Sequence, residues 1–422
     1  MTPSMLSIYM TNAAMLIYLF AAVFYVLYFI NKKPWAYIVS PIVAGVALVC
    51  HAVALIDRWI QGGFYRPPWT NLYESLIYFS FGLALISFVV ELRFKVRYLG
   101  AFVYLMVFSA LGLAFLVPVK EITPLVPSLQ SWWILSHSCL AAFAYSGFLV
   151  ASVLAFLYLV KVGMSERALG ASLGFVLMGV LLMVGGSEVF LQNKYLMTEM
   201  VNFNGAWVKN PIPGSDPVKF FMLEISHMAL LFQIGAALSF VASLVYIFIE
   251  IKIARLVLSV SYAVYTVLIG YMTWIIYSYQ SITMASNPYS YTLLVLFLFV
   301  VGFCLAYIYR GEKISLHLPE ATKLDQISYK VTLFAFPFMT LILITGAIWA
   351  HEAWGRFWGW DPKETTALVT WLIYAAYLHS RMTPGWSGKR AAVISIIGFF
   401  SVIFTYLGTN LVLSGLHSYG SK

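Results

Sequence analysis

Charged residues are scarce in this chain. Of its 422 residues, Asp, Glu, Lys and Arg make up only 10%, whereas 62% are hydrophobic and the mean hydropathy is +0.88. In a typical soluble domain, about a quarter of all residues are charged. The composition therefore excludes a soluble globular protein and indicates a polytopic membrane protein.

Several motifs are also missing. The three cysteines, Cys50, Cys139 and Cys304, form no CxxC pair, so the chain is not expected to carry out thiol–disulfide exchange. There is no CxxCH, and hence no covalently attached c-type haem of its own. There is no GxxxxGK[ST], which excludes nucleotide hydrolysis by a P-loop.

Long apolar runs are what the chain does have. They do not alternate between apolar and polar residues, and each is long enough for a helix to cross the hydrocarbon core. The sequence thus predicts an all-α, polytopic helical bundle. We expect twelve spans, at about 5–30, 36–60, 71–92, 98–117, 132–160, 167–189, 221–250, 256–279, 291–309, 331–350, 363–380 and 391–414.

The basic residues orient these spans. One set of connecting loops holds sixteen of the 25 Lys and Arg residues against only six acidic residues. Because cytoplasmic loops are enriched in basic residues, this set is predicted to lie inside and both termini outside. The same asymmetry explains the sequence pI of about 9.2 without a nucleic-acid partner. The longest outer loop, 190–220, is interpreted as a polar connector, with a partner-binding loop as the alternative.

We expect three segments along the chain. Residues 1–130 form an N-terminal segment of four spans with outer loops, and 131–330 a central segment with additional spans. Residues 331–422 form a C-terminal segment that combines a tryptophan-rich stretch with the last three spans.

The seven histidines differ in their predicted depth. A neutral histidine is an inexpensive polar residue in a membrane and a good ligand for haem iron. His137 lies about five residues into its span from the outer side, roughly 8 Å deep at the usual helical rise, and His417 follows the last span on that side. His379 belongs to the inner level. The others are His51 and His227 in outer halves of spans, His351 in an outer loop, and His317 in an inner loop, where it is expected to be solvated.

The stretch WGRFWGWDPKETTALVTWLIYAAYLHSR, residues 354–381, places three tryptophans beside a helix start. Asp361 matches an N-cap residue and Pro362 an N1 proline, and Glu364 at N3 completes a capping box with Asp361. Trp354, Trp358 and Trp360 share one glycine-bearing loop, where an aromatic belt at the membrane interface or a flat ligand such as a porphyrin would explain them. Arg356 and Lys363 are placed to pair with carboxylates.

This stretch resembles the tryptophan-rich WWD signature of haem-handling proteins, specifically the CcsA (ResC) type of cytochrome c biogenesis protein. Three further segments are similar to that family: SLQSWWILSHSCLAAFAY (128–145), RWIQGGFYRPPWTNLYES (58–75) and GTNLVLSGLHSYG (408–420).

The resemblance implies a subunit of a system II cytochrome c synthase that works with a CcsB (ResB) type partner. Haem b, bound non-covalently, would be brought to the outer face and joined to the cysteines of CxxCH in an apocytochrome c. By position, His137 and His417 match the two outer axial ligands and His379 the transmembrane histidine. The WWD residues, Trp354 to Asp361 with Lys363, would hold the haem for attack by the thiols. The implied location is the bacterial cytoplasmic membrane, with the site facing the periplasm, rather than the thylakoid membrane.

The chain departs from the family pattern in its extra spans, because typical members have about eight. His227 lies among these extra spans and has no counterpart. His351 stands where the family often has asparagine, and His51 is a candidate substitute for a histidine that the partner usually supplies. Two other functions stay open on the sequence: a haem exporter or chaperone without ligase activity, and a b-type haem electron-carrier subunit of a respiratory complex.

Overall fold

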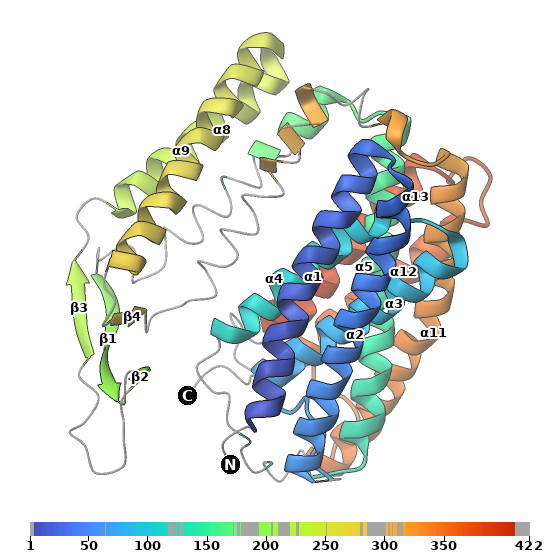
Figure 1. Ribbon diagram of the computed structural model, residues 1–422. Coiled ribbons are helices and arrows are strands. Elements are labelled where there is room, and N and C mark those ends of the chain that lie inside the picture. Colours follow the sequence, from blue (N-terminus) through green and yellow to red (C-terminus); the bar gives the residue numbers. More distant parts are fainter. Residues whose placement is uncertain are drawn as a thin grey trace. The chain divides into compact units, whose positions relative to one another are not determined.

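The fold is described from a computed structural model (Figure 1). It describes residues 4–63, 65–116, 130–171, 194–203, 206–209, 220–224, 228–249, 251–278, 282–284 and 315–409, and in addition 122, 125, 173, 174, 178, 301, 302, 304, 305 and 307–309. The chain divides into two compact units, Met1–Val162 with Ser315–Lys422, and Gly163–Ile314. The predicted division into the segments 1–130, 131–330 and 331–422 rests on sequence features, and the division into two compact units does not test it.

The first unit is a helical bundle. Its helices are α1 (Met5–Asn31), α2 (Pro34–Gly62), α3 (Leu72–Phe94), α4 (Tyr98–Leu116), α5 (Trp133–Val162), α11 (Ala321–Trp354), α12 (Pro362–Ser380) and α13 (Lys389–Ile403), and the π-helical turn η2 (Phe404–Gly408) follows α13. In Figure 1 these helices run roughly side by side. Within the described residues, the predicted helical membrane architecture is confirmed.

Seven helices are long and apolar enough to cross a membrane in the part of the chain that the structure describes. They are α1, α2, α3, α5, α9, α11 and α13 with the start of η2, and two shorter apolar stretches lie at Tyr98–Ala114 and Gln233–Phe248. The predicted segment 363–380 is helical as α12 but is not apolar enough to join the seven. Most of the predicted spans 167–189 and 291–309 lies outside the described residues. The total of twelve and the sidedness of the termini therefore stay predictions.

The second unit differs from the prediction at one span. Its helices α8 (Met228–Phe248) and α9 (Ile251–Ser278) accompany a small antiparallel sheet of β1 (Lys194–Phe203), β2 (Ala206–Lys209), β3 (Phe220–Glu224) and β4 (Ile282–Met284), in which β1 pairs with each of the others. The expected helix 221–250 is thus wrong at its start, where β3 pairs with β1. A short apolar run does not by itself distinguish a strand from a helix, and pairing with β1 decides it. Likewise, the loop 190–220 contains two strands.

The helix α11 is longer than expected. It has 34 residues instead of the twenty predicted at 331–350, so it is about 51 Å long at 1.5 Å per residue, against a hydrocarbon core of about 30 Å. Its last turn contains His351 and Trp354, and Gly355 ends it in the left-handed conformation with φ 71°. His351 and Trp354 are therefore helical, and the expectation that they belong to a loop is wrong.

The helices α5, α11, α12 and α13 share one core. Phe148 of α5 stacks on Tyr374 of α12, with ring centroids 3.5 Å apart. Gly147 allows α5 to approach α11 closely, because a Cβ added there would lie 2.7 Å from the Cβ of Ala335. This close packing holds the helix ends that form the site described below.

Several basic residues of the first unit lie at the end of the bundle that is opposite to this site. This end is the predicted inner end. Arg381 makes two hydrogen bonds to Asp325, at 2.7 and 2.8 Å. Lys32 donates to the hydroxyl of Tyr98 (2.5 Å) and to a backbone carbonyl (2.6 Å). Burial, and next the nearby charge of Lys161, lower the pKa of Lys32 to about 8.

Candidate functional site

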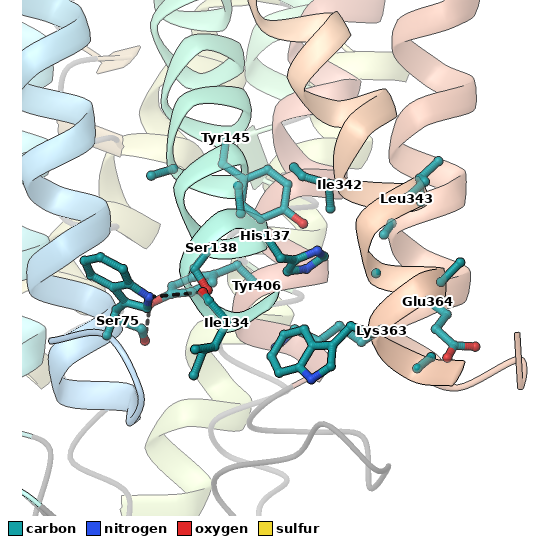
Figure 2. Close-up of a pocket in the computed structure, with 18 of the residues that line it drawn as sticks. Ser75, Ile134, His137, Ser138, Tyr145, Ile342, Leu343, Lys363, Glu364 and Tyr406 are labelled. Atoms are coloured by element: carbon teal, nitrogen blue, oxygen red, sulfur yellow. Dashed lines mark hydrogen bonds between the residues drawn. The ribbon is translucent and has the colours of Figure 1, made fainter. Parts of the chain in front are cut away.

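A cavity of about 190 Å³ lies where several helix ends meet (Figure 2). Its walls come from residues 69–71 and the first turns of α3, from the start of α5, from the end of α11 with the residues after it, from the start of α12, and from Tyr406 of η2. The wall is mostly aromatic and apolar. Four tryptophans line it, Trp69, Trp349, Trp354 and Trp358, together with the predicted His137 and Lys363.

His137 is held in a fixed orientation. Its Nδ1 lies 3.0 Å from the hydroxyl of Thr345, and its ring meets Trp349 edge to face at 5.6 Å. When Thr345 donates its hydroxyl proton to the carbonyl of Leu341 (2.7 Å), it accepts at His137 and Nδ1 carries the proton. Nε2 is then the nitrogen with a lone pair, which is the arrangement that metal-binding histidines use.

Gly346 brings α11 against this ring. A Cβ added at Gly346 would lie 3.0 Å from Cε1 of His137, closer than nearly all real contacts. Glu352 holds the same two helices together one turn further out, because its carboxylate accepts from the indole of Trp133 (2.8 Å) and the hydroxyl of Ser131 (3.1 Å). The position of His137 is therefore determined by contacts between α5 and α11.

The tryptophan-rich segment contributes two of its three rings to the cavity. Trp354 lies in the last turn of α11 and Trp358 in the loop, and both line the wall. Trp360 meets Trp358 edge to face at 5.8 Å, but 70% of its surface is exposed and it does not line the cavity. It adopts φ 56°, a left-handed conformation that costs a non-glycine residue about 1–2 kcal/mol.

The start of α12 confirms the predicted capping box. Asp361 accepts from the backbone of Lys363 (3.2 Å), and Glu364 accepts from the backbone of Asp361 (3.3 Å). Glu364 also accepts from the backbone N–H of Gly359 at 2.8 Å. One carboxylate therefore connects the helix start to the tryptophan loop, and both Lys363 and Glu364 line the cavity.

The remaining predicted residues that the structure describes do not line the cavity. His351 is exposed and stacks on Phe357, with centroids 4.2 Å apart, and the exposed Arg356 lies across the backbone of Gly359. His379 is exposed near the far end of α12, and His51 is fully buried in α2. His417 and His227 lie outside the described residues.

Two tryptophans of the wall were not predicted. Trp69 stacks on Tyr78 (4.2 Å) and donates to the carbonyl of Ile134 (3.4 Å), which ties the 69–71 segment to α5. Trp349 lies on the His137 side of α11. Trp69 belongs to the segment 58–75 that already resembled the family, and this was the available signal. For Trp349, five residues before Trp354 on one helix, we see no such signal.

No group of three or more His, Cys, Asp or Glu side chains gathers around a point in the described ranges. The cavity lies within those ranges. It offers one imidazole nitrogen within an aromatic wall, with one ammonium group at its edge, and this combination fits a large flat molecule that carries negative groups.

Comparison with known proteins identifies the family of the chain. A family model described as cytochrome C assembly protein matches residues 69–200 and 220–417. Several relatives carry the name cytochrome c biogenesis protein CcsA. The one from Nostoc sp. (strain PCC 7120) is 32% identical over 389 residues, 89% of this chain and 87% of the relative. The one from Synechocystis sp. (strain PCC 6803) is 29% identical over 418 residues, 98% and 97% of the two chains.

The family match and these identities extend over most of the chain and include both the His137 helix and the tryptophan-rich segment. The chain therefore belongs to the cytochrome c assembly protein family, as a CcsA-type member.

Proposed function

We propose that this protein presents haem at the outer face of the membrane and promotes its attachment to an apocytochrome c. The observation that carries the proposal is the orientation of His137. Its Nδ1 is hydrogen-bonded to Thr345, and its ring faces a cavity walled by four tryptophans. Haem b is the substrate, with its iron bound by Nε2 of His137. His417 is the second axial ligand, on the strength of its sequence position.

The reaction depends on the placement of its two reactants and does not need an acidic or basic side chain in the cavity wall. A cysteine thiol of CxxCH adds across a haem vinyl group: a C–S bond forms at one vinyl carbon, and the thiol proton goes to the other. This addition needs no oxidant or reductant, and correct placement of the two partners supplies most of the rate. Histidine ligation on both sides of the iron excludes oxygen, and the peptide histidine can later replace a protein ligand.

The residues of the tryptophan segment have separate roles in this proposal. Trp354 and Trp358 contact the porphyrin face, while Trp360 at the rim contacts the arriving apocytochrome. Lys363, half-buried at the cavity edge, pairs with one propionate. The exposed Arg356 pairs with the other. Asp361 acts by starting α12 and thereby placing Lys363.

His379 receives a different role. It is exposed near the end of α12 opposite to the cavity, and sixteen residues separate it from Lys363, or about 24 Å along a helix. We propose that it binds haem at the inner level before transfer outward, on a surface covered by a CcsB (ResB) type subunit. The bacterial cytoplasmic membrane, with the cavity towards the periplasm, is the proposed location.

The first test is an absorption spectrum. The full chain is purified from haem-replete membranes and its haem identified as a pyridine haemochrome, in the wild type, His137→Ala and the control His317→Ala. We expect b-type haem that falls at least tenfold in His137→Ala and is unchanged in the control. Wild-type haem content in His137→Ala contradicts the assignment.

The second test separates synthesis from the alternatives. The chain with its partner subunit is incubated with haem and an apocytochrome c, and covalent haem is detected on a denaturing gel. Thioether product supports the synthase. Haem transfer without covalent product supports an exporter or chaperone, and reduction of the bound haem by a quinol without product supports an electron carrier.

A further inference from the structure

A second polar feature lies in the N-terminal helices, away from the cavity. Along α1, the side chains of Ser7, Thr11, Tyr18 and Tyr25 follow one another at intervals of four and seven residues, so they share one face of the helix. Each exposes at most 4% of its surface. This face is covered by α2 and α4, so a polar seam runs inside a membrane-spanning group of helices.

The predicted inner end of the seam contains a carboxylate. Glu91 of α3 is completely buried. Its Oε2 accepts from the hydroxyl of Tyr25 (2.5 Å), and its Oε1 accepts from the guanidinium of Arg97 (2.6 Å). Arg97 retains some exposure, about 11% of its side chain, and lies over the ring of Tyr37. A group that can take up a proton is thus connected to the surface at this end.

Tyrosines and a histidine continue the seam at the middle of the bundle. Tyr104 of α4 stacks between Tyr25 (5.3 Å) and Tyr18 (5.6 Å), and its buried hydroxyl has no hydrogen-bond partner within the described part of the chain. The hydroxyl of Tyr18 lies 3.4 Å from Nδ1 of His51, and Phe81 of α3 closes the other side of this imidazole. Among the described residues, Nε2 of His51 has no hydrogen-bond partner, and the backbone of Ile77 lies close to this imidazole. Cys50 is the further titratable group beside Tyr18.

Hydroxyl groups extend the seam to the predicted outer end. Thr11 and Ser7 each donate to a carbonyl of their own helix, so their oxygen lone pairs stay available within the seam. At the end of α1, the hydroxyl of Ser4 donates to Asp57, and the amide of Gln61 donates to the same carboxylate (2.6 Å). The seam therefore begins and ends at a carboxylate.

Packing alone does not require these residues. A buried carboxylate, imidazole or phenol in a bilayer costs free energy that an apolar side chain of similar size avoids, so such residues mark ion or proton pathways. Neighbouring positions on α1 and α2 show that apolar side chains fit there. The fully buried alanines are Ala14, Ala21 and Ala22 of α1 and Ala44 and Ala47 of α2.

We propose that this seam carries protons across the membrane, between the Glu91–Arg97 end and Asp57, with His51 as the central carrier. A proton taken up by Glu91 passes to the oxygen of Tyr25 as that hydroxyl releases its own proton towards Tyr104, and the exchange repeats at Tyr18. Nδ1 of His51 receives the proton as Nε2 releases its own, and the hydroxyls of Thr11, Ser7 and Ser4 then each take up one proton and pass on another, the last of which reaches Asp57. Each hydroxyl gains one proton and loses one, so no redox partner is needed. This function is independent of haem binding.

The test uses the full chain in liposomes that contain a pH-sensitive dye, with a potassium diffusion potential to drive proton entry. Tyr18→Phe removes one oxygen from the seam, and Glu91→Gln removes the titrating group while retaining an acceptor for Tyr25. The matched control is Tyr9→Phe, which makes the same change on α1 at a side chain that is 57% exposed. Thermal unfolding and bound haem are measured on every variant.

We expect a wild-type proton flux above that of protein-free liposomes. It should fall at least tenfold in Tyr18→Phe and Glu91→Gln and be unchanged in Tyr9→Phe. A wild-type flux equal to that of empty liposomes overturns the proposal, and so does a Tyr18→Phe flux equal to that of Tyr9→Phe. If Glu91→Gln fails to fold, Tyr18→Phe alone decides, since a buried Tyr→Phe change keeps the shape of the ring.

Discussion

Replacing Glu364 by alanine should release the tryptophan loop from α12. The carboxylate accepts from Gly359 at 2.8 Å and from Asp361 at 3.3 Å, and both donors lose their partner in Glu364→Ala. Hydrogen bonds to a charged acceptor contribute about 1.5–3 kcal/mol each. Because the second bond is long and the site is partly open to water, we take about 2 kcal/mol for the pair. At 1.4 kcal/mol per factor of ten, the open loop becomes about 30-fold more populated.

Trypsin measures this population directly. Arg356 is exposed within the loop, and cleavage after it requires the loop to open, so the cleavage rate follows the open fraction when reclosing is fast. We expect the fragment ending at Arg356 to form about 30-fold faster in Glu364→Ala, by the 2 kcal/mol derived above. Glu364→Gln, whose amide oxygen still accepts both bonds, should stay within about threefold of the wild type, since a neutral acceptor loses only part of that energy.

Cleavage after Lys389, the first residue of α13, is the internal control, because Glu364 makes no contact there. Its rate should be the same in all three proteins. A less than threefold acceleration after Arg356 in Glu364→Ala would refute the reasoning, since the loop would then be held by other contacts. The assay involves no haem, so it tests the architecture of the site separately from its ligand.

Three further predictions concern packing and charge. Gly147→Ala, whose Cβ would lie 2.7 Å from that of Ala335, should lower the thermal midpoint through about 1–3 kcal/mol of overpacking, and adding Ala335→Gly should restore it; a double variant no more stable than the single one contradicts this contact. Gly346→Val, which presses on His137, should reduce bound haem at least tenfold with little loss of stability, and an unaltered haem spectrum contradicts it. Lys32, with its pKa lowered to about 8, should react with an amine reagent at a rate that levels off above pH 8, and only from the inner side of sealed vesicles. A rate that still rises tenfold per pH unit at pH 9 contradicts the lowered pKa. Labelling from the outside contradicts the orientation.

Local sequence was sufficient for those parts of the site that depend on neighbours in the chain. The Asp361–Glu364 capping box formed as predicted, because a cap needs only residues three positions apart. The helical membrane class followed from the long apolar runs, because backbone groups in a bilayer are satisfied only within helices or closed barrels. The segments for α1 to α5 were placed within a few residues for the same reason.

Contacts between distant segments could not be obtained in this way. Trp69 and Trp349 entered the wall because the 69–71 segment and α11 pack against α5, and neither position differs locally from an ordinary interfacial tryptophan. Conversely, Trp360 looked equivalent to Trp358 along the chain, yet its backbone conformation turns its ring into solvent. The strand β3 formed where an apolar run pairs with β1, 17 residues before it, a contact that a single run does not encode.

The sequence by itself determined a membrane-embedded helical protein, the charge asymmetry of its loops, and the histidine and tryptophan residues that connect it to cytochrome c assembly. Only the tertiary structure decided which of these lie together. It joined His137 to Thr345 and the tryptophan wall, placed His379 at the far end of α12, and enclosed His51 in a seam with tyrosines and Glu91. The physical reason is that helix periodicity and capping act over a few residues, whereas a binding site depends on close approach between helices far apart in the chain.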